Sequence, residues 1–508
     1  MTTPTPLTTD LYQLTMAQVY FRLGIHDRPA QFDHVFRSYP DYGSHQAGYC
    51  VAAGLEQLAE WVKLARFSDA DIAYLAGLEG RTGPLFSADF LDWLRTVSFL
   101  DGLRVEAVPE GRVVHANAPM TVVTAPLAVA QILETVLLNL LNYPTLIATK
   151  ASRVAGRARG RPVLEFGLRR GATGAGDPGA RAALIGGATF TSNVSASQRA
   201  GIAPKGTHGH SLVQALMALG SGELGAFEAY ADVYPDDCLL LVDTIDTIES
   251  GIPNAIRVFE RLQKQGHVPV GVRLDSGDLA HLAVRSAHML DEAGFPETTI
   301  VLSGGLDELS IWQILTQIDR ESSRYGVDST RLVERLSFGV GTSLITSEGA
   351  SALDGVYKLV AIEADDGWRP AIKVSETPAK VPNPGRKQLV RLYDQRGVAT
   401  ADLLAVHDED IGTMVSHQLL LRHPVDASTV RALEPAEVKS YETLLTTVID
   451  DGSVVAEFPA IDVLRARCAA DLERLDIGVR RLVNPHIYHV SLTERLWDLK
   501  QDLIATAR

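Results

Sequence analysis

The chain has 508 residues, of which 47 are lysine or arginine and 62 are aspartate or glutamate, so its formal net charge is −15. This acidic balance argues against non-specific binding to nucleic acid or to an anionic membrane, and any anionic substrate must meet a local basic cluster. Hydrophobic residues make up 46% and charged residues 21%, which is typical of a globular chain of about three domains and wrong for a disordered one. Three cysteines, an odd number placed far apart, argue against a disulfide framework and favour the reducing cytoplasm.

The N-terminal part predicts helices but no export or membrane segment. The first six residues have neither a basic nor an apolar region, so no signal peptide is expected. Residues 9–23 have helical spacing, with Thr9 or Asp10 as a plausible N-cap. The longest apolar stretch, 122–141, is interrupted by proline and polar residues, so we interpret it as a buried helix at about 126–142 and not as a membrane span.

Beyond this helix, short apolar runs alternate with helical patterns. The runs lie at 163–167, 239–246, 268–278, 299–308 and 336–344, and helical patterns follow near 252–265, 278–293 and 306–319. Continuous apolar strands at the spacing of βαβ units predict a parallel sheet that is buried on both faces. Polar residues cluster after each run, where α/β barrels and doubly wound sheets keep their sites. A barrel is the simpler interpretation, because many successive strand ends contribute polar residues to one site.

The pattern changes again after about residue 350. A hairpin is expected around Asp366-Gly367, then a strand-like stretch, and then mostly helical patterns. We therefore divide the chain into four parts. They are an N-terminal α+β domain at 1–125 completed by part of the C-terminal segment, an α/β barrel at 126–350, a β-rich segment at 351–430 that packs with the N-terminal domain, and a helical C-terminal region at 431–508.

The segment VRLDSGD (272–278) is the most informative motif, because it ends a strand and precedes a helix. Carboxylates at Asp275 and Asp278 can hold Mg²⁺ or a ribose hydroxyl, and the guanidinium group of Arg273 can donate two parallel hydrogen bonds to an anion. The small residues between the carboxylates let backbone N–H groups approach a phosphate. The plain alternative is a capping turn, and the motif alone leaves the two interpretations equal.

Two other strand ends, SGGLDE (303–308) and GVGTSL (339–344), also leave backbone amides open in the manner of a phosphate cradle. In EFGLRR (165–170), Phe166 can stack on a planar ring, and Arg169 and the arginine after it can clamp a phosphate or carboxylate. The alternative is a core phenylalanine beside a solvated basic turn.

The segment KGTHGHS (205–211) has histidines at i and i+2, and three interpretations compete. The pair can bind a metal as in hydrolases, one histidine can accept a phosphoryl group, or both can be ordinary loop residues. Spacing alone favours the last. Tyr12, in the first helix, is by its own context a core residue.

Ten segments, taken in order, resemble the nicotinate phosphoribosyltransferase family. They are TDLYQLTMA, ATKASR, EFGLRR, TSNV, GTHGHS, VDTID, VRLDSGDL, SGGLDE, GVGT and PGRK. Each is unspecific, but the ordered set is specific, and it runs from about residue 8 to 400 with a weaker continuation at 484–492. The resemblance implies an irregular type II α/β barrel with a smaller α+β domain from both chain ends, in a homodimer with shared active sites. It also implies ATP-coupled formation of nicotinate mononucleotide and pyrophosphate from nicotinate and 5-phosphoribosyl-1-pyrophosphate in NAD biosynthesis.

The resemblance also implies roles for single residues. His210 matches the phosphorylated histidine, and Asp275 and Arg273 match the catalytic groups that face the ring, the ribose and the pyrophosphate. Phe166 matches one face of an aromatic sandwich around nicotinate, and Tyr12 matches the other, delivered from a second subunit. The other expected substrate contacts are Arg169, Ser192, Asp243, Ser276, Gly277 and Asp278, with Gly304, Gly305, Gly341 and Thr342 as the 5′-phosphate cradle.

Ser192 bears on substrate choice, because related nicotinamide enzymes have an aspartate there. A serine hydroxyl can donate to a carboxylate, so the resemblance favours nicotinate. Expected cofactors are Mg²⁺, held through Asp275 or Asp278, with ATP and 5-phosphoribosyl-1-pyrophosphate as co-substrates. The alternatives are a nicotinamide or quinolinate phosphoribosyltransferase, a barrel hydrolase with Zn²⁺ on His208 and His210, and a nucleotide-binding protein without activity.

Overall fold

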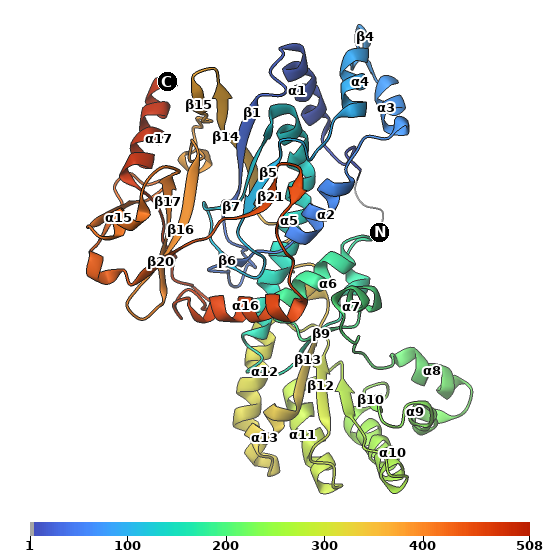
Figure 1. The fold of residues 1–508 in the computed structure, drawn as a ribbon. Coiled ribbons are helices and arrows are strands. Elements are labelled where there is room, and N and C mark those ends of the chain that lie inside the picture. The colour runs from blue at the N-terminus through green and yellow to red at the C-terminus, as the bar shows by residue number, and fades with distance from the viewer. Residues whose placement is uncertain (1–4, 508) are drawn as a thin grey trace. The chain divides into compact units, whose positions relative to one another are not determined.

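The computed structural model describes residues 5–507 and divides the chain into two units, whose elements are labelled in Figure 1. Both chain ends, Met1–Thr149 and Gly349–Arg508, form the terminal unit, and Lys150–Glu348 form the middle unit. A unit built from both ends was expected, but it is the larger of the two and not the smaller. The first boundary also differs, since residues 126–149 belong to the terminal unit and not to the barrel.

The middle unit is built on a six-stranded sheet whose neighbours all pair in parallel, in the order β10-β11-β12-β13-β8-β9. The strands are β8 (Val163–Glu165), β9 (Phe190–Thr191), β10 (Leu239–Leu241), β11 (Gly271–Leu274), β12 (Thr299–Ser303) and β13 (Leu336–Val340). The apolar runs predicted every strand except β9, which has only two residues. Among the described residues no ladder joins β9 to β10, so the barrel is irregular, and the predicted fold class is confirmed.

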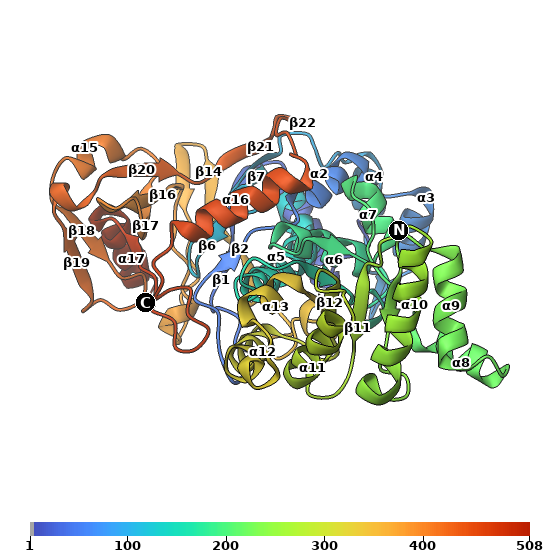
Figure 2. The ribbon, with the colours of Figure 1, turned by 90° about the horizontal axis from the view of Figure 1, so that it is seen from below.

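Helices cover this sheet. In Figure 2, α10 (Ile252–Lys264), α11 (Leu279–Glu292), α12 (Glu308–Glu321) and α13 (Ser329–Arg335) follow one another along it, and each contacts the next. Three of these helices were predicted. In α10 the apolar stripe has the spacing of a helix that buries one face, because Ala255, Val258, Phe259 and Leu262 are all buried. The remaining helices of this unit are α6 (Gly176–Ile185), α7 (Val194–Ala200), α8 (His210–Ala218), α9 (Gly222–Val233) and α14 (Thr342–Ile345).

The terminal unit contains a seven-stranded antiparallel sheet in the order β15-β14-β1-β7-β5-β21-β22. Its strands are β1 (Pro29–Phe36), β5 (Arg104–Ala107), β7 (Pro119–Pro126), β14 (Gly355–Ala364), β15 (Gly367–Pro370), β21 (Thr446–Asp450) and β22 (Ser453–Val454). The hairpin expected around Asp366-Gly367 is confirmed, because β14 and β15 pair across two residues.

A second, six-stranded sheet of this unit has the order β19-β18-β23-β17-β16-β20. Its strands are β16 (Lys387–Tyr393), β17 (Ala399–Val406), β18 (Leu419–Arg422), β19 (Val430–Leu433), β20 (Ser440–Thr443) and β23 (Val490–Leu492). The region 431–508 was expected to be helical. It contains α16 (Ile461–Glu473) and α17 (Glu494–Thr506), but also β20 to β23. These strands are too short to show a period of two, so pairing with distant partners decides their structure.

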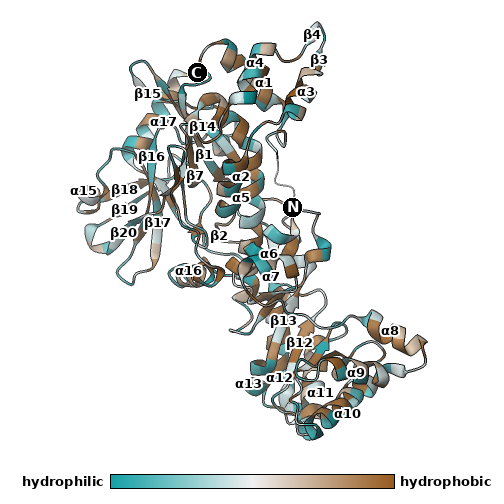
Figure 3. Ribbon diagram, turned by 45° about the vertical axis from the view of Figure 1, so that its right-hand side comes forward, coloured by the Kyte–Doolittle hydropathy of each residue, from teal (hydrophilic) through white to brown (hydrophobic). Residues whose placement is uncertain are grey.

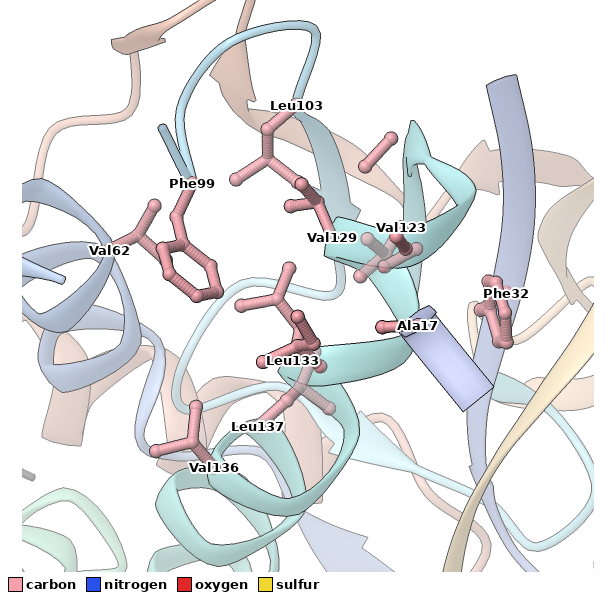
Figure 4. Packing of buried hydrophobic residues seen from close by; sticks show 14 of the residues in the cluster. Ala17, Phe32, Val62, Phe99, Leu103, Val123, Val129, Leu133, Val136 and Leu137 are labelled. Carbon is pink, nitrogen blue, oxygen red and sulfur yellow. The ribbon is translucent and has the colours of Figure 1, made fainter. Parts of the chain in front are cut away.

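The long helix α5 (Leu127–Ala155) supplies much of the core of the terminal unit. In Figure 4, its residues Val129, Leu133 and Val136 pack toward Val62 and Phe99. Within the described residues, α5 alone is long and apolar enough to cross a membrane by length and composition, yet 61% of its apolar window is buried inside the protein. The expected buried helix is therefore confirmed.

Helix α5 continues beyond its expected end, because tertiary contacts hold it past Pro144. The Thr149 hydroxyl donates to the Thr145 carbonyl at 2.6 Å and accepts from the Val51 N–H at 2.9 Å. The other helices of the terminal unit are α1 (Leu11–Arg22), α2 (Leu55–Leu64), α3 (Asp69–Ala76), α4 (Ala88–Thr96) and α15 (Ile411–Val415).

A buried arginine ties several parts of the terminal unit together. Arg391 on β16 donates to both carboxylate oxygens of Asp402 at 2.7 and 2.9 Å, to Asp471 at 3.3 Å, and to the Val113 carbonyl at 2.9 Å. Arg391→Met leaves the buried Asp402 carboxylate without its cation and leaves Asp471 with Arg112 as its remaining arginine, so we expect the free energy of unfolding to fall by about 3–5 kcal/mol in urea titrations.

The control is Arg396→Met, which removes an exposed arginine whose Nη2 lies 2.8 Å from Asp394 Oδ2. Solvent screens that pair, so no measurable loss is expected. Equal losses in the two variants would contradict a special contribution from burial.

Candidate functional site

Polar side chains meet at the carboxyl ends of β11 and β12. Arg273, on β11, donates from Nη2 to Asp275 Oδ1 at 2.8 Å and from Nε to Ser303 Oγ at 2.8 Å. The Ser303 hydroxyl in turn bonds to Asp275 Oδ1. Because parallel strands end at the same edge of a sheet, residues distant in sequence form one charged cluster there.

An aromatic ring that directly follows β8 lies beside this cluster. The Arg273 guanidinium lies 5.2 Å from the centre of the Phe166 ring, within the range of a cation–π contact. The ring fits only because residue 339 is glycine, since a Cβ there would lie 2.5 Å from a ring carbon. At Gly304, where φ is +97°, a Cβ would lie 2.0 Å from the Asp275 carbonyl oxygen. Two glycines therefore let Phe166 and Asp275 approach their neighbouring strands.

Asp243, after β10, connects the histidine loop to this cluster. Its side chain is 3% exposed. Oδ1 lies 3.0 Å from His210 Nε2, and Oδ2 accepts from the Asp275 N–H at 3.1 Å and from the Ser276 hydroxyl at 2.6 Å. A carboxylate only accepts, so His210 Nε2 carries a proton, and in the neutral ring the lone pair is then on Nδ1.

His208 has a structural position instead. Its Nε2 accepts from the Leu241 N–H at 3.1 Å, which leaves the proton on Nδ1, and burial lowers the pKa of the ring. The two-histidine zinc site of the hydrolase alternative is therefore not assembled. Within residues 5–507, no group of three or more His, Cys, Asp or Glu side chains could hold a metal ion by itself.

The two aspartates of VRLDSGD have different surroundings. Asp278 caps α11 by accepting from the His281 N–H at 3.1 Å, and both of its oxygens accept from the Gln317 amide. The capping interpretation therefore applies to Asp278. Burial opposes the charged form of Asp275, but the Ser303 hydrogen bond and the Arg273 charge keep the pKa of this carboxyl below its usual range. Mg²⁺ binds one or two carboxylates together with phosphate oxygens and water, a donor chemistry that the charged, half-buried Asp275 fits.

The other predicted residues are less involved in the cluster. Ser192 follows β9 and is half-buried, whereas Arg169, in the turn after β8, is exposed. Gly305 lies in the turn after β12, Gly341 and Thr342 lie at the start of α14 after β13, and Gly277 lies beside Ser276 before α11. Tyr12 belongs to the terminal unit and is 49% exposed on α1, so the interpretation as a core residue is wrong.

Sequence reasoning did not select Glu165, Thr191, Ser303 or Gly339. Glu165 is fully buried, and burial raises the pKa of its carboxyl. Its signal was a carboxylate at the end of an apolar strand, in the first position of EFGLRR. Ser303 and Gly339 likewise lie within motifs that were noted for other residues.

Models of one family cover most of the chain. The N-terminal domain of nicotinate phosphoribosyltransferase matches residues 7–142, the family's central model matches 165–380, and its C-terminal domain matches 386–500. The chain belongs to the nicotinate phosphoribosyltransferase family. The family match thus continues well beyond residue 400, where the sequence motifs became weak.

Two relatives within the nicotinate phosphoribosyltransferase family match over nearly their whole length. The Bacillus subtilis (strain 168) nicotinate phosphoribosyltransferase is 39% identical over 500 residues, covering 98% of this chain and 95% of that protein. The human nicotinate phosphoribosyltransferase is 33% identical over 555 residues, covering 98% of this chain and 97% of that protein.

A crystal structure of human nicotinic acid phosphoribosyltransferase superimposes with a TM-score of 0.80 and 30% identity, covering 97% of this chain and 99% of that one. The nicotinate-nucleotide pyrophosphorylase of Pyrococcus furiosus, with a TM-score of 0.65 and 22% identity, shares the fold.

Proposed function

We propose that this enzyme transfers the phosphoribosyl group of 5-phosphoribosyl-1-pyrophosphate to nicotinate, releasing pyrophosphate, in NAD biosynthesis. The observation that carries the proposal is the Arg273–Asp275–Ser303 cluster beside Phe166, at the strand ends of a chain that belongs to this family. The three cysteines are buried free thiols, which supports a place in the reducing cytoplasm.

The cluster provides the charges that this reaction needs. Loss of pyrophosphate leaves an oxocarbenium-like ribosyl centre, which the Asp275 carboxylate stabilises. Arg273 faces the leaving anion, and Phe166 stacks on the pyridine ring. Arg169 and the N–H groups of the glycine turns at 304–305 and 341 bind phosphate oxygens. When bound, Mg²⁺ neutralises charge on the departing pyrophosphate.

The His210–Asp243 pair couples transfer to ATP. The Nδ1 lone pair of His210 attacks the γ-phosphorus of ATP, the bond to the β-phosphate oxygen breaks, and ADP leaves. Asp243 accepts from the His210 Nε2–H throughout. Its carboxylate therefore orients the imidazole ring and stabilises the positive charge that the ring gains on phosphorylation. Asp243 also accepts from the Asp275 N–H, so this one side chain connects the phosphorylation site to the transfer site.

Substrate choice follows from Ser192. A hydroxyl can donate to the carboxylate of nicotinate, whereas an aspartate in its place would repel that group and accept from a nicotinamide NH₂. The nicotinamide alternative is therefore less well supported than nicotinate.

The active unit is a homodimer that shares its sites. Figure 3 shows α8 as mostly hydrophobic, yet Val213 is its one buried residue. Met217 and Leu219 expose large apolar side chains at its end. An apolar surface of this kind is typical of a face covered by a second copy. In this proposal Tyr12, which is exposed on α1, completes a site of the other subunit.

Tyr12→Ala is expected to weaken nicotinate binding by about 1–3 kcal/mol, because one face of the ring loses its stacking partner. The nicotinate KM measures this, with Tyr74→Ala, another exposed tyrosine, on α3, as the control. Mixing the Tyr12→Ala and Asp275→Ala variants should restore some activity, since one site of each heterodimer then has both residues. No restoration after subunit exchange would contradict shared sites.

A product assay tests the proposed reaction itself. The purified chain is incubated with Mg²⁺, 5-phosphoribosyl-1-pyrophosphate and either nicotinate, nicotinamide or quinolinate, with and without ATP, and the mononucleotide is quantified. We expect nicotinate mononucleotide, in greater yield with ATP. Product from nicotinamide alone would contradict the role of Ser192, and no product from any of the three would contradict the transfer reaction.

A further inference from the structure

The two proposed contacts to nicotinate are each held in a short backbone turn. Phe166 lies between Glu165 and Gly167, and the Glu165 carboxylate accepts from the Gly167 N–H. This bond closes a loop around Phe166 and constrains the backbone that carries its ring. Gly167 has no room for a side chain, because a Cβ would lie 2.5 Å from Ile345 Cβ.

The second turn has the same construction. Ser192 lies between Thr191 and Asn193, and Thr191 Oγ1 accepts from the Asn193 N–H at 2.9 Å. Asn193 in turn caps α7 by accepting from the Ala196 N–H at 3.1 Å. The backbone on both sides of Ser192 is therefore fixed by the Thr191 hydroxyl and the start of α7.

Two side-chain hydrogen bonds join the two turns, the shorter from the Thr191 hydroxyl to the Glu165 carboxylate and the longer, at 3.4 Å, from the Ser192 hydroxyl to the Glu165 carbonyl oxygen. The Thr191 hydroxyl donates to Glu165 Oε2 at 2.6 Å, and the Glu165 carbonyl accepts from the Ser192 N–H at 3.0 Å. Glu165 and Thr191 are both fully buried and lie directly opposite each other in the β8–β9 ladder. That ladder has only two registered pairs, Leu164 with Phe190 and Glu165 with Thr191, so backbone pairing alone holds β9 weakly.

We propose that Glu165 and Thr191 are positioning residues whose hydrogen bond sets the separation between the Phe166 ring and the Ser192 hydroxyl, and thereby the selectivity for a planar ring bearing a carboxylate. This inference rests on the proposed function, because it takes nicotinate as the ligand of both turns. A carboxyl group suits the arrangement, since one of its oxygens accepts from the Gly167 N–H and the other from the Thr191 hydroxyl.

Thr191→Val tests the proposal, because valine has nearly the same shape but cannot donate to Glu165. We expect the KM for nicotinate to rise about tenfold, the KM for 5-phosphoribosyl-1-pyrophosphate to stay the same, and the preference for nicotinate over nicotinamide to fall. Thr191→Ser keeps the hydroxyl and should restore the nicotinate KM. If Thr191→Val does not fold, Glu165→Gln replaces it as the test. Glutamine presents an NH₂ group to one of the two donors, so the same rise in the nicotinate KM is expected.

The matched control is Thr298→Val. Thr298 is buried next to the other end of β12, and its hydroxyl donates to the Phe295 carbonyl at 2.9 Å. This variant also loses a buried hydroxyl, so it reports the effect of lower stability alone, and its nicotinate KM should not change.

Two results would overturn the proposal. One is an equal nicotinate KM in Thr191→Val and Thr298→Val, and the other is a parallel rise in the KM of both substrates, which indicates general damage. Failure of the proposed function itself is recognised separately, because the wild-type chain would then form no nicotinate mononucleotide.

Discussion

His210→Ala is expected to abolish the stimulation of product formation by ATP while slow transfer continues. The variant removes the nitrogen that accepts the phosphoryl group, whereas the groups that meet the phosphoribosyl donor, Arg273 and Asp275, are held by Ser303 and each other. The measurement is the yield of nicotinate mononucleotide with and without ATP, together with acid-labile ³²P incorporated from γ-labelled ATP.

The chain provides a matched control for this variant. His267 Nδ1 lies 2.9 Å from Asp236 Oδ1, a second histidine–aspartate pair on the surface of the middle unit. His267→Ala should keep both the label and the ATP stimulation. An ATP-dependent yield that is unchanged in His210→Ala would rule out the phosphohistidine.

Asp275→Asn is expected to lower kcat by about 10²–10³-fold, the loss typical of removing one preorganised electrostatic group. The Ser303 hydrogen bond and the charge of Arg273 keep the pKa of Asp275 below its usual range despite burial, so the native group is negative at neutral pH. Asparagine has nearly the same shape but no charge, and it leaves Arg273 without its anionic partner. Steady-state kinetics should show a fall in kcat that exceeds any rise in the KM for either substrate.

Asp291→Asn separates this effect from the loss of any arginine–aspartate pair. Asp291, near the C-terminal end of the same helix that follows Asp275, has Oδ1 2.6 Å from Arg335 Nη1. That variant should retain full kcat. If Asp275→Asn retained full kcat as well, the carboxylate would not stabilise the ribosyl centre.

The local sequence pattern was sufficient to predict the parallel sheet and the motifs at its edge. The strands that lead into VRLDSGD, SGGLDE and GVGT are mostly apolar, because both faces of the sheet are buried, and the polar residues that follow them must leave the core. The ordered motifs also identified the family and named His210, Asp275, Arg273 and Phe166.

Contacts between distant residues were decided only by the folded chain. Asp243 bonds to a histidine 33 positions earlier, and Glu165 bonds to a threonine 26 positions later, so neither pairing leaves a local trace. The Asp278 carboxylate faces Gln317 instead of the cluster, although its local pattern resembles that of Asp275.

The same reason explains the errors in secondary structure and burial. The strands after residue 430 are a few residues long, so hydrogen bonds to β5, β16 and β17 decide them and periodicity does not. Tyr12 has the spacing of a core residue but lies on the exposed side of α1. Periodicity reports which residues are apolar, whereas tertiary packing decides which faces are covered.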